Sequence, residues 1–469
     1  MAESKNDLFS LYKKALYWAT LGMGLFYMMW SLMQFIVWKK PYVKLMKWCW
    51  IALALGVVLY VVIAKLRYPE EMEKIKEFLR RERSREQIFL IGFFLWYIVC
   101  VAARTMIDGK DRFGPNDNRM FYTALSVMLM FPLTEIMGRE RIKKFMNVAL
   151  NIALVTYTAV CAWVLVNYLQ GILVSFPSGN AVEVYKNQSL TIGIHRNTTA
   201  AYSMIILGIC VYMLMTLRSK LRFLVYIPAM LVHFLVIVLT NSRTCFVVVF
   251  CMAALAAIAR GLKYIKIKNK VLVFALVAVV LVVGVAAFSL LRNEIIANSA
   301  EVWREKLQKP GIMNTRKIFG GFNGRVNIWI ASVKLMFSSP DRFLFGVTPT
   351  MLPSVLQGIG QFPVNQPHCH NMILQVGACF GVPMMILYTW FCVSIIRRSY
   401  RVMKYEGDKL FKGAWTVPLI LFGILLTETM EVLTMANKFF NQPMFFLLAG
   451  WIVVMDKILA EKTGLKATE

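Results

Sequence analysis

Apolar residues recur along this chain in long runs, separated by short connections that are basic or polar. Most runs approach the roughly 20 residues that a helix needs to cross about 30 Å of hydrocarbon. The pattern therefore predicts an all-α, polytopic membrane protein with about twelve transmembrane helices. Their predicted ranges are 15–38, 46–64, 88–104, 120–137, 146–169, 199–217, 222–240, 244–259, 271–290, 371–395, 414–431 and 442–456.

The distribution of Lys and Arg predicts the orientation of these helices. Cytoplasmic loops of membrane proteins are enriched in both residues. With the N-terminus inside, most of the 53 basic residues fall in inner segments. Four lysines in the short outer segment 39–47 oppose the rule locally. An even number of helices then places both termini in the cytoplasm.

Composition supports a membrane protein and argues against a nucleic-acid-binding one. Hydrophobic residues make up 58% of the chain and charged residues 17%, whereas soluble domains are about 45–50% apolar. The net charge of +28 lies in short loops between apolar runs, where it encodes orientation and attraction to anionic lipid.

Most of the nine cysteines lie in apolar runs, which indicates that they are small buried hydrophobic residues. The first run, near Ala15, lacks a cleavage site and predicts a spanning helix.

The chain divides into three predicted parts. Residues 1–290 hold transmembrane helices 1–9, residues 291–370 form a large external loop, and residues 371–469 hold helices 10–12 and a cytoplasmic tail. A second outer segment covers about 170–198. Long loops in compact proteins are usually functional or disordered, so both outer segments are candidates for function.

The large external loop contains a helical pattern. Its apolar positions recur at helical spacing, and they are Val326, Trp329, Ile330, Val333 and Phe337. Asn327, Lys334 and Ser338 face away from this stripe. We expect an amphipathic helix that lies over the bundle or in the membrane interface.

Polar residues gather at the outer ends of the predicted helices. Such residues survive at membrane depth where they line water-filled cavities. The candidates are His370 and Asn371 at the start of the tenth helix, Arg243 in a tight connection, Arg196 at the start of the sixth helix, Arg325 at the start of the amphipathic helix, and Arg104 at the end of the third. Several cations and one imidazole at one level predict a site for an anionic group.

Each of these residues also has a plainer interpretation. An arginine at the end of a membrane helix often extends to lipid phosphate, Arg325 could be a solvated loop residue, and His370 could cap a helix. Arg243 fits such an interpretation less well, because its connection is too short to be merely solvated. The His368-Cys369-His370 sequence does not predict a metal site, because adjacent residues point apart and no second ligand pair has the usual spacing.

Two carboxylates lie near the outer end of the eleventh predicted helix. Glu428 and Glu431 are spaced i, i+3 and so share one helix face. Carboxylates at this depth are costly unless they are paired or hydrated. The favoured interpretation is a salt bridge to a nearby arginine or to Lys438. The alternative is a catalytic base or a group that orients the acceptor.

Three short segments together resemble one known family. The first is His370-Asn371-Met-Ile-Leu374, followed by Gly377 and Gly381. The second runs from Gly324-Arg325 through Trp329 to Pro340 and Gly346, and the third is Ser242-Arg243 between two helices. In this order and topology they are similar to the O-antigen ligase and polymerase family. The similarity is best over 190–400, whereas the first four helices match only in hydropathy.

This resemblance implies a function and roles for the candidate residues. The family's fold would be GT-C-like, and its reaction an inverting glycosyl transfer that requires no metal or cofactor. The donor would be a glycan on undecaprenyl diphosphate, and the acceptor a glycan or lipid hydroxyl at the outer face of a bacterial cytoplasmic membrane. The implied roles are diphosphate binding for Arg243, Arg325 and Arg196, general base for His370, and ring or sugar contact for Asn371. Glu428, Glu431 and Arg104 would be supporting residues.

Other functions remain open from the sequence. The motifs do not separate a ligase, which moves finished chains, from a polymerase, which joins repeat units. A flippase or transporter is a further alternative, although the chain lacks the paired halves that transporters often show. The last alternative is a non-catalytic scaffold with envelope-assembly partners.

Overall fold

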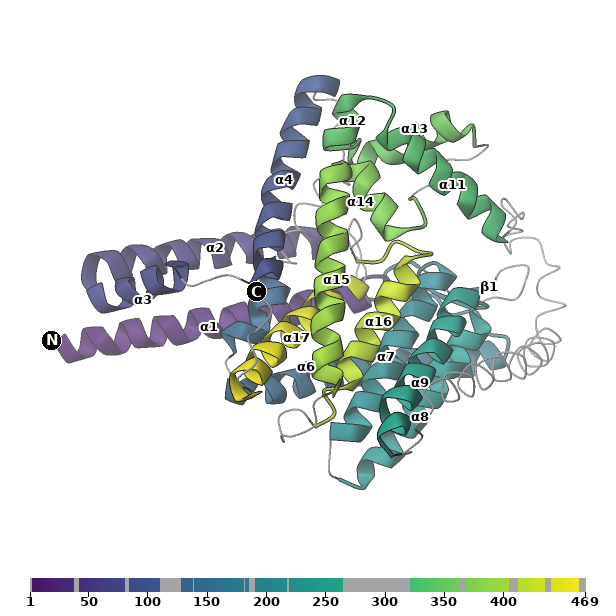
Figure 1. Cartoon of the computed structure of the whole chain (residues 1–469). Coiled ribbons are helices and arrows are strands. Elements are labelled where there is room, and N and C mark those ends of the chain that lie inside the picture. Colours follow the sequence, from purple (N-terminus) through teal and green to yellow (C-terminus); the bar gives the residue numbers. More distant parts are fainter. Residues whose placement is uncertain are drawn as a thin grey trace.

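A computed structural model describes most of the chain. The described residues are 2–37, 42–80, 84–109, 128–137, 139–180, 182–184, 190–216, 219–264, 321–362, 368–404, 412–434 and 440–463. Nearly all of them are helical (Figure 1), and the described part contains one two-stranded antiparallel sheet. The predicted all-α class is therefore confirmed.

The helices follow the apolar runs. Their bounds are α1 Ala2–Met33, α2 Tyr42–Arg67, α3 Pro69–Arg80, α4 Arg85–Asp108, α6 Arg139–Leu169, α7 Arg196–Thr216, α8 Leu221–Leu239, α9 Arg243–Tyr264, α11 Gly321–Met336, α12 Pro340–Phe345, α13 Thr348–Gly360, α14 Met372–Phe380, α15 Val382–Lys404, α16 Thr416–Glu428 and α17 Asn441–Thr463. The strands are β1 Val182–Val184 and β2 Leu190–Ile192.

Six described helices are long and apolar enough to cross a membrane. They lie in α2, α4, α6, α7, α8 and α17, and they match six of the predicted transmembrane helices. Shorter apolar helices cover Arg243–Ala256 and Thr416–Glu428. The predicted helix 271–290 and much of 120–137 lie outside the described residues. The total of about twelve therefore stays a prediction.

The helices differ sharply in burial. In the apolar windows of α7 and α17, 78% and 83% of the residues are buried inside the protein, against 6% in α2. Helices α7 and α17 therefore form the centre of the bundle. Helix α2 pairs with α1 and α3 in an arm that extends from the bundle (Figure 1). Its apolar side chains face outward, as expected for lipid contact.

The predicted tenth helix, 371–395, is wrong as one continuous helix. The chain forms α14 and then α15, with Gly381 between them at a φ of +88°. That conformation suits glycine, which has no Cβ. The indole N–H of Trp96 donates to Phe380 O at 2.9 Å, and Val347 N–H donates to Ala378 O at 2.9 Å. Hydrophobicity alone did not reveal this break, because both helices are apolar.

Two glycines permit the α12 segment to touch this break through its backbone. A Cβ on Gly381 would lie 1.9 Å from Leu344 O, and one on Gly346 would lie 2.3 Å from the carbonyl carbon of Cys379. The α12 segment is therefore packed directly against the backbone at the junction of α14 and α15.

Alanine at Gly381 is expected to disrupt this contact. The backbone clash and the unfavourable φ together should lower the free energy of unfolding by about 3 kcal/mol. Thermal unfolding of the purified protein in detergent measures the effect. Gly358→Ala on α13 is the matched control, because a Cβ there meets nothing within 4 Å. Equal unfolding temperatures for both variants would contradict the proposed backbone contact.

The predicted helix of the 291–370 segment is confirmed as α11. The side chains that pack inward include Ile328, Ala331 and Leu335. The predicted stripe points outward instead, with Val333 43% and Phe337 62% exposed. The small residues Ala331 and Ser332 lie on the buried face, and an exposed apolar face agrees with the predicted position in the membrane interface.

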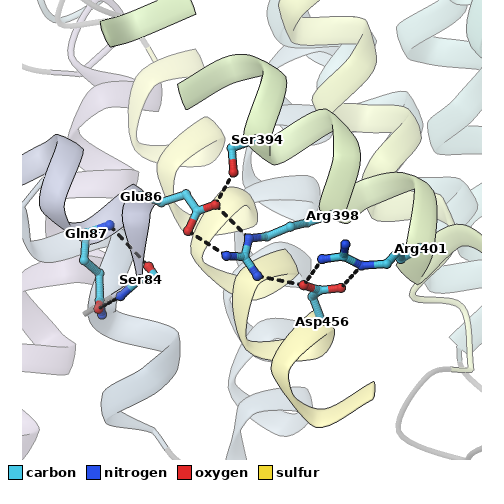
Figure 2. Close-up of polar contacts among 7 residues, drawn as sticks. All are labelled: Ser84, Glu86, Gln87, Ser394, Arg398, Arg401 and Asp456. Carbon is cyan, nitrogen blue, oxygen red and sulfur yellow. Dashed lines mark hydrogen bonds and ion pairs between the residues drawn. The ribbon is translucent and has the colours of Figure 1, made fainter. Parts of the chain in front are cut away.

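An ion-pair network joins three helices at the opposite end of the bundle from α12 (Figure 2). Arg398 on α15 donates to Glu86 on α4 at 2.7 Å and to Asp456 on α17 at 2.7 Å. Arg401 also pairs with Asp456, and Ser394 donates to Glu86. We call Glu86, Ser394, Arg398, Arg401 and Asp456 the inner network, because the predicted topology places these helix ends in the cytoplasm.

Candidate functional site

Glu431 is the centre of a polar cluster at the other end of the bundle. It lies just beyond the end of α16 and is 5% exposed. Its Oε1 accepts from Arg325 Nη2 at 2.6 Å and from Asn197 Nδ2 at 2.5 Å. Its Oε2 faces His370 Nδ1 at 3.5 Å. One carboxylate thus joins α7, α11 and the segment before α14.

The turn before α14 fixes His370 in this cluster. His370 has a φ of +52°, which is uncommon for a residue with a side chain. Its carbonyl accepts from Trp329 Nε1 at 3.4 Å, and its N–H donates to His368 Nδ1 at 3.2 Å. Asn371 then caps α14, accepting from Leu374 N–H at 3.1 Å. We define the outer cluster as Asn197, Arg325, His368, His370 and Glu431.

The charges in the outer cluster balance one another. Burial alone would raise the pKa of Glu431, but the facing His370 and the positive charge of Arg325 lower this pKa to about 2. Glu431 is therefore an anion at neutral pH. Burial, with the neighbouring His370, lowers the pKa of His368 to about 3, so His368 is a neutral imidazole.

The remaining predicted arginines fall into two groups. Arg196 begins α7 beside Asn197. Arg243 begins α9 and is exposed, and the thiol of Cys245 in the same turn donates to Asn197 O at 3.7 Å. Both arginines therefore lie on helix starts that adjoin the outer cluster. Arg104 instead pairs with Asp341 at 2.8 Å and Asp108 at 3.4 Å, which ties α4 to α12.

The two predicted carboxylates have different surroundings. Glu428 is the last residue of α16, and Glu431 lies outside the helix, so they do not share a helix face. Glu431 makes an ion pair with Arg325. Glu428 is buried and accepts from the hydroxyl of Tyr388 at 3.1 Å. Lys438, the other predicted partner, lies outside the described residues.

Three ligand-type side chains meet in the outer cluster. Ligand atoms of His368, His370 and Glu431 lie within 4.8 Å of one another. The expectation that the side chains of the His368-Cys369-His370 sequence point apart is therefore wrong for the two histidines, whose ring centroids lie 4.1 Å apart. Arg325 places a guanidinium on the carboxylate of this group, and Nδ1 of His368 accepts the His370 N–H.

Sequence reasoning missed two members of the outer cluster. The sequence analysis assigned no role to Asn197, and it assigned His368 neither a metal nor a catalytic role. Asn197 could have been noticed, because an amide directly after Arg196 at the start of a buried helix needs a partner. His368 offered no comparable signal, since its contact with His370 depends on the turn.

The fold and the outer cluster define a class of protein. An apolar helical bundle with cations, imidazoles and a carboxylate at one end fits a multi-pass membrane protein with a polar site at one face. The O-antigen ligase family model matches residues 228–389, and this match confirms the resemblance to the O-antigen ligase and polymerase family. The matched segment includes Arg243, Arg325 and His370. No curated protein matches the chain.

Proposed function

We propose that this protein transfers a glycan from undecaprenyl diphosphate to an acceptor hydroxyl at the outer face of the membrane. The observation that carries the proposal is the facing pair of His370 and Glu431, held among arginines on helix starts. The family match supports the reaction class. The position of the cluster at one end of the bundle favours transfer at a membrane face over transport through the middle.

In this proposal, Glu431 sets the tautomer of His370. A carboxylate opposite Nδ1 favours the proton on that nitrogen. The lone pair of Nε2 is then available to accept a proton. The acceptor oxygen attacks the anomeric carbon, its proton passes to Nε2, and the bond between that carbon and the diphosphate oxygen breaks. The departing group is undecaprenyl diphosphate, and the sugar configuration inverts.

The arginines would stabilise the leaving group. Negative charge grows on the diphosphate as the glycosidic bond breaks, and a guanidinium binds phosphate oxygens through a planar fork that stays ionised. Arg243 begins α9, Arg196 begins α7, and Arg325 lies in the second turn of α11, which begins at Gly321. A helix N-terminus carries a partial positive charge that would add to that of Arg243 and Arg196.

The direct test uses purified protein, a glycan on undecaprenyl diphosphate and a hydroxyl acceptor. We expect transfer, with release of undecaprenyl diphosphate, and a fall of about 10²-fold or more in Arg243→Ala. Arg342→Ala is the matched control, because Arg342 lies on α12 and bonds only locally to Ser338. Equal activity in both variants would contradict the role of Arg243.

The same assay addresses two finer points. Activity is expected to persist in excess EDTA, because the proposed steps use only protein side chains. Loss of activity in EDTA that Mg²⁺ or Zn²⁺ restores would contradict the metal-independent mechanism.

Product size separates the two forms of the reaction, since a ligase adds one preformed chain whereas a polymerase gives a ladder of repeat units.

A further inference from the structure

Two backbone groups in the turn that carries His370 are bonded to side chains. Cys369 N–H donates to Gln375 Oε1 at 2.9 Å, and the His370 carbonyl accepts from Trp329. The left-handed φ of His370 is costly for a residue with a side chain, and such strain persists only where the surroundings enforce it. The backbone N–H of His370 needs a further contact.

The side chain of His368 makes that contact. Its Nδ1 accepts the backbone N–H of His370, two residues later, at 3.2 Å. The two rings meet edge to face, with centroids 4.1 Å apart. A side-chain acceptor bonded to the N–H two residues on is the geometry of an Asx turn, here made by an imidazole. His195 makes a longer version of the same bond, accepting from Asn197 N–H at 3.4 Å.

We infer that His368 is a positioning residue, whose Nδ1 fixes the backbone of His370 and so aims the His370 imidazole at Glu431. The inference rests on the proposed role of His370 in transfer. His368 does not itself receive the proton in this scheme. Because Nδ1 accepts a hydrogen bond, the proton of the neutral ring lies on Nε2, and His368 acts through geometry alone.

Loss of the Nδ1 acceptor would release the turn. The His370 N–H would have no partner, and the left-handed conformation would lose its support. A shift of about 1 Å in a catalytic group can cost roughly 10²-fold in rate. Since His368 is not assigned to substrate binding, the loss should fall on kcat while KM changes little.

Three substitutions at His368 test this inference in the full-length protein. Asparagine places an amide oxygen close to the position of Nδ1, and glutamine carries its oxygen one bond further away. Leucine removes the acceptor. We expect His368→Asn to retain kcat within about threefold, and His368→Gln and His368→Leu to lose about 10²-fold. Equal loss in all three variants, or no loss in His368→Leu, would overturn the inference.

A second measurement separates this inference from the proposed function. Amide hydrogen exchange at His370 is expected to be slow in wild type and His368→Asn, and at least tenfold faster in His368→Leu. Unchanged exchange in His368→Leu would overturn the positioning role. If wild type transfers no glycan from any lipid-linked donor, the proposed function fails, while the exchange result still decides how the turn is held.

Discussion

Replacing His370 with alanine is expected to lower glycan transfer by about 10²- to 10⁴-fold, the range that general acid–base catalysis contributes. The physical reason is the loss of the Nε2 lone pair that would accept the acceptor proton. In the His370→Ala variant, Glu431 is expected to keep its contacts with Arg325 and Asn197. Transfer from a lipid-linked donor, measured as kcat at saturating acceptor, gives the effect.

The left-handed φ of His370 calls for a second variant. Alanine is disfavoured at a φ of +52°, whereas asparagine tolerates this conformation. His370→Asn should therefore fold as wild type and still lack the base. Wild-type transfer by either variant would exclude His370 as the base. Loss of activity in the alanine variant alone would show that backbone strain, not proton transfer, explains its defect.

Replacing Arg398 with alanine is expected to lower the free energy of unfolding by about 3–5 kcal/mol, the usual cost of removing one partner of a buried ion pair. Glu86 is fully buried, and Arg398 is its cationic partner in the inner network (Figure 2). Without Arg398, the Glu86 carboxylate would keep the hydroxyl of Ser394 but lose its cationic partner. Thermal or denaturant unfolding in one detergent measures the loss.

Arg401 supplies the matched control for this prediction. Its side chain is 29% exposed, and Asp456 keeps Arg398 when Arg401 is removed. Arg401→Ala should therefore cost only about 1 kcal/mol. The double variant Glu86→Leu, Arg398→Met should be more stable than Arg398→Ala, because it leaves no unpaired charge on Glu86. Equal stability of Arg398→Ala and Arg401→Ala would contradict this account.

The inner network and the contact of α12 with Gly381 both involve α15. Helix α15 is tied to α4 and α17 by ion pairs at one end, and it adjoins the Gly381 contact with α12 at the other. Helix α14, which follows the His370 turn, precedes Gly381 directly. The candidate site is thus built on a helix pair that is fixed at both ends, as precise positioning of a catalytic group requires.

Several features of this protein follow from the sequence alone. Apolar runs of membrane length give the class and six described transmembrane helices, because hydrocarbon admits only backbone that bonds to itself. Helical spacing of apolar residues gives α11. Motifs around Arg243, Arg325 and His370 give the family resemblance, and these three residues indicate an anionic substrate by their chemistry.

Tertiary structure decided what each polar residue contacts. Glu431 meets Asn197, Arg325 and His370, which come from three distant parts of the chain. The break at Gly381, the inward face of α11 and the pairing of Arg398 with Glu86 likewise depend on distant segments. Local propensity and hydropathy describe one segment at a time. They therefore cannot reveal which buried charge meets which, or where two backbones touch.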